Sequence, residues 1–229
     1  NQTASTVEQR FYGVTDDDKR GVIRQILKDR AIRQAIVFGN SKLGVARLAR
    51  AFERDGLRTA ALHGDKSQDE RLKSLEAFKR GEVELLVATD VAARGLDIAD
   101  LPAVFNFDVP FNAEDYVHRI GRTGRAGASG EAVSLVSLDE EGFMKEIERF
   151  TRQDIPVQVI EGFAPEPDEQ AEPIAMGRQT LWGGLGKPPS REVMAAAARA
   201  ARQEMMERIR EKKQTEGGSR QGDGFKDKS

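Results

Sequence analysis

The chain has 229 residues, 38% of them apolar, and its 36 basic and 38 acidic side chains leave a net charge of −2. It has no cysteine and only two histidines, which excludes disulfides and thiolate metal sites and argues against zinc, so we expect no metal site. The near-neutral charge means that any nucleic-acid site must rest on local clusters. No apolar run reaches membrane-spanning length and no signal peptide opens the chain, so we expect a cytoplasmic protein without membrane partners. The first residue is Asn rather than Met, as expected of a fragment or of a processed chain.

Strand and helix patterns alternate along the first 160 residues. A β-favouring stretch at 5–14 precedes a helix that we expect Thr15 to cap. Short apolar runs typical of buried strands follow at 35–39, 59–63, 84–90, 103–108 and 131–137. The apolar stripes of the intervening helices are Val22, Ile23, Ile26 and Leu27; Leu43, Ala46, Leu48, Ala49 and Phe52; and Leu72, Leu75 and Phe78. This alternation predicts an α/β fold, with a mainly parallel sheet covered by helices on both faces.

Polar loops follow the predicted strands, where the working residues of such sheets lie. They read GNSK (39–42), HGDKSQDER (63–71), TDVAARGLD (89–97) and DVPFN (108–112). Taken singly, Asp90 fits a helix cap, Asp97 a turn residue and His63 a satisfied neighbour of a strand end. Taken together, hydroxyls, amides and charges at one edge of one sheet predict a surface for a nucleotide and nucleic acid.

The segment 116–127, YVHRIGRTGRAG, carries four closely spaced basic residues: His118, Arg119, Arg122 and Arg125. Arginines at this spacing on a helical turn are expected to project several guanidinium groups toward one side. Convergent guanidinium groups suit a polyphosphate or a phosphodiester backbone, because each binds two oxygens at once. The alternative is a solvated basic turn, but the density of this array after an apolar strand favours phosphate binding.

These segments resemble, in order and spacing, the motifs of the second RecA-like domain of DEAD-box RNA helicases. AIVFGNSK resembles motif IV, HGDKSQDER the QxxR segment, LVATDVAARGLDI motif V and YVHRIGRTGRAG motif VI. The resemblance covers residues 7–160 and implies a RecA-like fold of the P-loop NTPase type. Ser41 stands where Thr is common in the family, which keeps the hydroxyl.

The resemblance also implies a role for each matching residue. Arg122 and Arg125 would be arginine fingers that reach ATP, while Gly95 and Asp97 would contact the nucleotide. Motif coupling across the domain interface would involve Asp90, His118 and Arg119. The RNA sugar–phosphate backbone would meet Ser41, Lys42, Gly64, Arg71 and Thr89. Arginines neutralise charge in phosphoryl transfer, and hydroxyls, amides and point charges suit backbone recognition without base readout.

The family's phosphate loop, magnesium carboxylates and Ser-Ala-Thr motif do not occur here. GGLGKPPS (183–190) and PDEQAEP (167–173) only imitate the first two. The resemblance therefore implies ATP and Mg²⁺ in the full-length enzyme, bound mainly by an N-terminal RecA-like domain, with RNA as the other partner. Two alternatives stay open: a stand-alone RNA-binding or regulatory module without ATPase activity, and half of a DNA translocase.

The composition changes after residue 160. We expect a helicase domain at 1–160, an acidic Pro- and Gly-containing linker at 161–189, an amphipathic helix at 190–213 and a disordered tail at 214–229. Trp182 would either anchor the linker or dock onto the core or a partner. Ser190 is expected to cap the helix. A solvated helix or one packed on a protein partner is favoured over one that binds RNA. The linker and tail resemble those of bacterial RhlE-type helicases.

Overall fold

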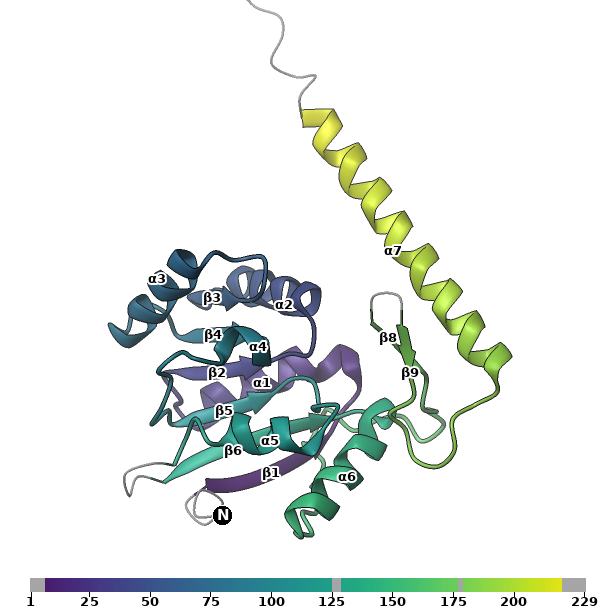
Figure 1. Ribbon diagram of the computed structural model, residues 1–229, viewed down its shortest axis with the longest axis horizontal. Helices are drawn as coiled ribbons and strands as arrows, with labels where there is room; N and C mark the ends of the chain where they lie inside the picture. The colour runs from purple at the N-terminus through teal and green to yellow at the C-terminus, as the bar shows by residue number, and fades with distance from the viewer. Residues whose placement is uncertain (1–6, 125–128, 177–178, 220–229) are drawn as a thin grey trace, which may run out of the picture. The chain divides into compact units, whose positions relative to one another are not determined.

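The computed structural model describes residues 7–124, 129–176 and 179–219 (Figure 1). It divides into two compact units. The first comprises the chain to Glu172 together with Gly183–Gly186, and the second comprises Pro173–Trp182 with the segment from Lys187 onward. None of the helices within the described ranges has the length and apolar character needed to cross a membrane.

A seven-stranded sheet forms the centre of the first unit, in the order β3-β4-β2-β5-β6-β1-β7 (Figure 1). Every strand pair in it is parallel, with Ile36, for example, in register with Leu86 and Val104. The expected parallel α/β sheet is confirmed. The strands are β1 (Val7–Gly13), β2 (Ala35–Phe38), β3 (Thr59–Leu62), β4 (Leu85–Ala88), β5 (Ala103–Asn106), β6 (Gly130–Val136) and β7 (Val157–Gln158).

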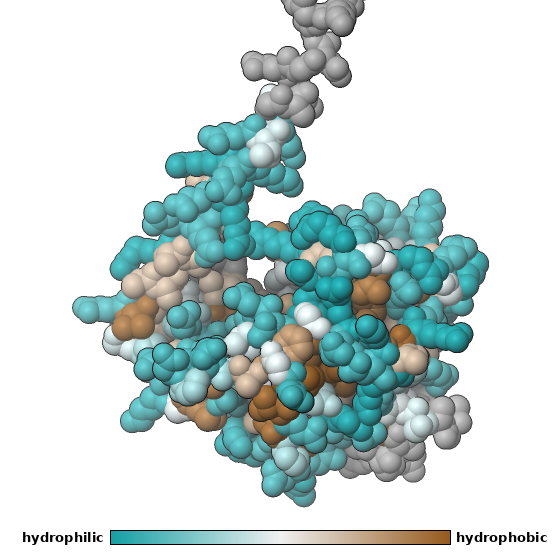
Figure 2. Space-filling model, turned by 180° about the vertical axis from the view of Figure 1, so that it is seen from behind, coloured by the Kyte–Doolittle hydropathy of each residue, from teal (hydrophilic) through white to brown (hydrophobic). Residues whose placement is uncertain are grey.

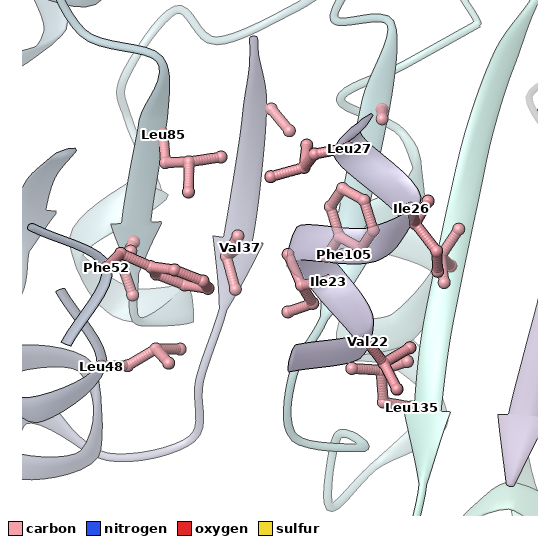
Figure 3. Close-up of a cluster of buried hydrophobic side chains, with 14 of the residues drawn as sticks. Val22, Ile23, Ile26, Leu27, Val37, Leu48, Phe52, Leu85, Phe105 and Leu135 are labelled. Carbon is pink, nitrogen blue, oxygen red and sulfur yellow. The ribbon is translucent and has the colours of Figure 1, made fainter. Parts of the chain in front are cut away.

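Helices cover both faces of this sheet, because alternate residues of the apolar strands point to opposite sides. One face packs against α1 (Lys19–Asp29) and α2 (Lys42–Arg54), and Figure 3 shows this cluster, with Phe52 of α2 and Ile23 of α1 over Val37. The other face packs against α3 (Gln68–Lys79), α4 (Asp90–Ala93), α5 (Ala113–Ile120) and α6 (Glu141–Thr151). Two 3₁₀ turns, η1 (Asp16–Asp18) and η2 (Leu138–Glu140), precede α1 and α6.

Four of these helices begin directly at the carboxyl edge of the sheet, each with a capping side chain. The side chain accepts a hydrogen bond from a backbone N–H in the first turn, which satisfies a donor that has no intrahelical partner. The pairs are Ser41 with Gly44 (3.0 Å), Ser67 with Glu70 (3.1 Å), Thr89 with Ala92 (3.3 Å) and Asn112 with Asp115 (2.9 Å). The strand-end loops are therefore short and fixed at both ends.

Three local expectations are corrected. Thr15 precedes a 3₁₀ turn and makes no side-chain capping bond, so α1 begins only at Lys19. Leu43 lies in the first turn of α2 and is 46% exposed. Leu72 is 42% exposed, because α3 lies over the edge of the sheet and buries only Leu75 and Phe78.

The second unit is an antiparallel pair, β8 (Ile174–Met176) and β9 (Gln179–Leu181), followed by α7 (Arg191–Ser219). The pair lies inside the segment expected to be a linker, and α7 continues six residues beyond Lys213. The expected cap is present, since Val193 N donates to Ser190 Oγ at 3.4 Å. The division of the chain at residues 160, 189 and 213 stays a prediction, and the part of the expected tail at 220–229 lies outside the described residues.

Candidate functional site

Arg119 is the centre of the carboxyl edge of the sheet. Its side chain is 1% exposed and binds Asp90 through two parallel hydrogen bonds, Nε to Oδ1 at 2.7 Å and Nη2 to Oδ2 at 2.8 Å. The guanidinium also lies over the ring of Phe38, 5.2 Å from its centroid. Its other acceptors are Asn40 Oδ1 (2.6 Å), Asp108 O (2.7 Å) and Asn106 Oδ1 (3.2 Å).

These bonds join α5 to the ends of three neighbouring strands, β2, β4 and β5. A planar guanidinium with five donors suits this position better than an ammonium would, because each partner requires a donor in a fixed direction. Asp90 and Arg119 thus pair with each other within this domain, and their coupling role across the domain interface stays a prediction. His118, the third residue of that group, is exposed.

Asn40, Asn106 and Asp108 complete this network, and the sequence analysis did not single them out. Asn40 donates its backbone N–H to Asp108 Oδ2 (2.9 Å) and its side-chain Nδ2 to Val109 O (2.9 Å). Asn106, fully buried at the end of β5, donates to Ser134 Oγ at 2.9 Å. The sequence signal that could have identified Asn106 is its position inside an apolar strand. A buried amide there requires hydrogen-bond partners, because an unpaired polar group would be costly.

The guanidinium group of Arg122 is hydrogen-bonded to backbone carbonyl groups. Its Nη1 donates to Leu96 O (3.0 Å) and Ile98 O (3.3 Å), and its Nη2 donates to Ala93 O (3.1 Å). Arg119 and Arg122 therefore bind different acceptors within this domain, the Asp90 carboxylate at the start of α4 and backbone carbonyls at and after its end. Arg125 lies outside the described residues.

The loop that Arg122 holds carries the two predicted nucleotide contacts. Gly95 has φ +76°, a left-handed conformation that favours glycine, and no atom lies within 4 Å of where its Cβ would be. The Asp97 side chain is 89% exposed, with its Oδ2 3.7 Å from Lys79 Nζ. This loop thus offers open backbone beside an accessible carboxylate.

The five predicted RNA contacts lie in the loops and first helical turns that follow three neighbouring strands, β2, β3 and β4. Ser41 and Thr89 are helix caps whose hydroxyl oxygens accept from backbone, which leaves each O–H available as a donor. Lys42 is exposed and its Nζ lies 3.0 Å from Asp65 Oδ1. Gly64 is exposed, with open space at its Cβ position, and the buried Nε of Arg71 has no hydrogen-bond partner among the described residues.

His63 is a hydrogen-bonded neighbour of the end of β3, which is one of the interpretations that the sequence allowed. It is 7% exposed, and its Nδ1 accepts from Asp65 N at 3.3 Å. Burial, and to a lesser extent Lys66, lowers the pKa of His63. A neutral ring that closes the turn after β3 follows from these contacts.

A buried ion pair between Lys19 and Glu140 holds the backbone next to Asp108. Lys19 Nζ binds Glu140 and donates to Phe107 O at 2.7 Å, while Glu140 Oε2 accepts from Val109 N at 2.7 Å. Burial disfavours the ammonium, but Glu140, Asp108 and Asp16 together raise the pKa of Lys19. The pair thus fixes the backbone on either side of Asp108, which in turn holds Asn40. The sequence analysis missed it because its members are 121 residues apart.

Gly183, the first glycine of the segment 183–190, has a structural explanation. Gly142 N donates to Gly183 O at 2.7 Å, and a Cβ on Gly183 would lie 2.3 Å from the ring of Phe143. Close packing on α6 accounts for this glycine without a phosphate ligand.

Comparison with known proteins shows the family of this chain. The family described as Helicase conserved C-terminal domain matches residues 18–127. The crystal structure of the E. coli DEAD-box protein SrmB, bound to regulator of ribonuclease activity A, matches with a TM-score of 0.66 and 35% identity, over 72% of this chain and 96% of that one. The chain belongs to the DEAD-box RNA helicases. It corresponds to their C-terminal domain, as the motif resemblance implied.

Curated DEAD-box relatives cover the same region. The ATP-dependent RNA helicase RhlB of Xanthomonas oryzae pathovar oryzae is 41% identical over 174 residues, which are 75% of this chain and 30% of RhlB. CshA of Geobacillus kaustophilus is 46% identical over 151 residues, which are 66% of this chain and 32% of CshA. The chain thus spans about a third of the length of these relatives. Its resemblance to the RhlE type stays a prediction.

Proposed function

We propose that this DEAD-box domain is the C-terminal half of an ATP-dependent RNA helicase that unwinds short RNA duplexes or remodels RNA–protein complexes. The observation that carries the proposal is the Arg119 network, which holds the loops after β2, β4 and β5 together at one edge. Relatives named as ATP-dependent RNA helicases support it. The whole protein would work in the cytoplasm.

The nucleotide side of the proposal concerns ATP bound mainly by an N-terminal RecA-like domain. Gly95 and Asp97 would contact that nucleotide, and the open space at Gly95 fits the close approach of a ligand. Arg122 and Arg125 would neutralise charge on the transferred phosphate. No cluster of three metal-ligating side chains occurs within the described ranges, so Mg²⁺ would depend on ligands from the other domain.

Arg122 would have to exchange partners to reach a triphosphate, because its guanidinium is bound to three carbonyls. Anionic phosphate oxygens form stronger hydrogen bonds with Arg than neutral carbonyls do. Domain closure over ATP would supply that exchange.

The RNA side of the proposal uses Ser41, Lys42, Gly64, Arg71 and Thr89. Their hydroxyls, amides and charges suit sugar and phosphate rather than base edges, so recognition would be tolerant of sequence. α7 is the segment through which a protein partner or further RNA would be recruited.

The test is ATP hydrolysis by the whole protein in the presence of RNA or of single-stranded DNA of the same sequence. We expect strong stimulation by RNA and little by DNA. Stronger stimulation by DNA than by RNA would indicate a DNA translocase, and no hydrolysis with either would indicate a stand-alone binding module.

A further inference from the structure

A groove of about 560 Å³ lies between α1 and α2, within the size range of ligand sites, about 300–1,000 Å³. It is lined on the α2 side by Gly44, Arg47, Arg50 and Arg54 and on the α1 side by Asp16, Asp17 and Arg20, with Phe107 between them. The motif resemblance assigned no role to this groove. Figure 2, which shows the molecule from behind, displays a largely hydrophilic surface with smaller hydrophobic areas.

Three arginines of α2 have no partner in this groove. Arg47, Arg50 and Arg54 are exposed and, within the described part of the chain, form no ion pair. Arg20, in contrast, lies 2.9 Å from Asp55 and is neutralised there. Asp16 faces the buried Lys19 at 3.5 Å, and Asp17 on the same side is exposed. The unpaired positive charges of the groove lie along α2 and outnumber the acidic groups on the opposite side.

The spacing of the three arginines is locally unfavourable. At intervals of three and four they lie on one face of α2, where like charges repel and destabilise a helix. Natural proteins depart from such local rules mainly at functional sites. A partner that presents several negative charges in a row would remove this repulsion.

The groove is continuous with the proposed RNA edge at two points. Gly44, which lines it, donates its N–H to Ser41 Oγ in the turn that also carries Lys42. Arg50 lies near enough to His63 to contribute to the lowering of its pKa, together with burial, Lys66 and Lys42. The groove thus begins at the turn that carries Ser41 and Lys42, and its three arginines follow along α2.

We propose that this groove binds the phosphodiester backbone of single-stranded RNA that continues from the edge formed by Ser41 and Lys42, with Arg47, Arg50 and Arg54 as its phosphate contacts. The inference rests on the proposed function, because the edge must itself bind RNA. Continuity with that edge favours RNA over an acidic segment of a protein, which the charge alone would also accept. Asp16 and Asp17 restrict the backbone to the α2 side.

The test is the salt dependence of RNA affinity for the 229-residue chain, measured by fluorescence anisotropy with oligoadenylates of about 5 and about 15 nucleotides, lengths typical of single-strand sites. The triple variant Arg47→Ala/Arg50→Ala/Arg54→Ala should bind the longer RNA with a log–log salt slope less steep by about 2, at about 0.7 per lost contact. Its affinity deficit should therefore shrink about sixteenfold between 50 and 200 mM salt. Binding of the shorter RNA should change little.

Two matched variants control for charge and folding. Lys28→Ala/Arg33→Ala/Arg152→Ala removes the same charge from exposed positions outside the groove and should leave the slope unchanged. Arg47→Lys/Arg50→Lys/Arg54→Lys should restore the slope, because ammonium groups also displace counterions. Thermal unfolding of each variant confirms that it is folded.

A third arm, Lys42→Ala/Arg71→Ala, reports on the proposed RNA edge itself. If that variant loses affinity for RNA while the arginine triple variant keeps the wild-type slope, the groove proposal is overturned and the proposed function stands. If the triple variant keeps its RNA slope but loses binding of polyglutamate, the groove takes an acidic protein and the RNA proposal is wrong.

Discussion

At the scale of single residues, arginine performs two different tasks in this domain. Arg119 is buried and fully paired, and it organises the strand ends. Arg122 is held less deeply, by three backbone carbonyls, and anchors the loop that carries Gly95 and Asp97. Both tasks depend on the several donors of the planar guanidinium group. The bonds of Arg119 are structural, whereas under the proposed function Arg122 would exchange its carbonyl acceptors for phosphate oxygens.

Arg119→Ala should destabilise the domain by about 3–5 kcal/mol, because it leaves the Asp90 carboxylate without its partner. Urea unfolding of the 229-residue chain, followed by circular dichroism, measures this. Arg94→Ala is the matched control: Arg94 is 64% exposed, bonds Asp115 at 3.2 Å and should contribute about 0–1 kcal/mol. Similar losses in both variants would contradict the central role of Arg119.

Arg122→Ala in the whole enzyme should lower kcat by about a thousandfold to a hundred-thousandfold, the range for an arginine finger. RNA affinity should change little. Arg122→Lys should rescue poorly, because an ammonium cannot bind two phosphate oxygens as the planar group does. Separate measurements of kcat at saturating RNA and of RNA affinity distinguish an arginine finger from an RNA contact. A loss of RNA affinity alone would show that this segment binds RNA.

At the scale of elements, the position of a helix over the sheet decides how much of its apolar stripe is buried. α2 packs over the central strands and buries Val45, Leu48 and Phe52. α3 packs against the edge of the same sheet and leaves Leu72 half in solvent. The two helices thus contribute unequally to the core, although each leaves one leucine of its predicted stripe exposed, Leu43 in α2 and Leu72 in α3.

Leu75→Ala should therefore destabilise the domain by about 2–5 kcal/mol, as for other buried leucines, since it leaves a cavity beneath α3. Leu72→Ala changes the same side chain three residues earlier on the same helix and should cost less than about 1 kcal/mol. Chemical denaturation of the two variants side by side tests the difference. Equal losses would show that Leu72 is buried in solution.

At the scale of the whole molecule, the proposed function gives this domain only part of a catalytic site. Its strand-end loops offer cations and open backbone, but the chain carries neither the family's phosphate loop nor its magnesium carboxylates. A triphosphate would thus lack the backbone cradle and the metal that phosphoryl transfer requires.

We accordingly expect no ATP hydrolysis by the purified 229-residue chain, with or without RNA, and weak or undetectable ATP binding. A coupled phosphate-release assay with and without Mg²⁺ measures the first, and calorimetry measures the second. Magnesium-dependent turnover by this chain, unchanged in an Arg122→Ala control, would point to a nucleotide site elsewhere in it.

The sequence by itself determined the parallel α/β fold, the family and the order of the strand-end loops. Apolar runs such as 35–39 and caps such as Ser67 are local signals, and parallel strands necessarily bring their carboxyl ends to one edge. Only the tertiary structure decided which partners the side chains in those loops take. Asn40 and Arg119 are 79 residues apart, Lys19 and Glu140 are 121 apart, and the partners of Arg122 are backbone carbonyls that no side-chain pattern marks. Such contacts depend on the directions in which a folded backbone presents its polar groups, and local sequence does not encode those directions.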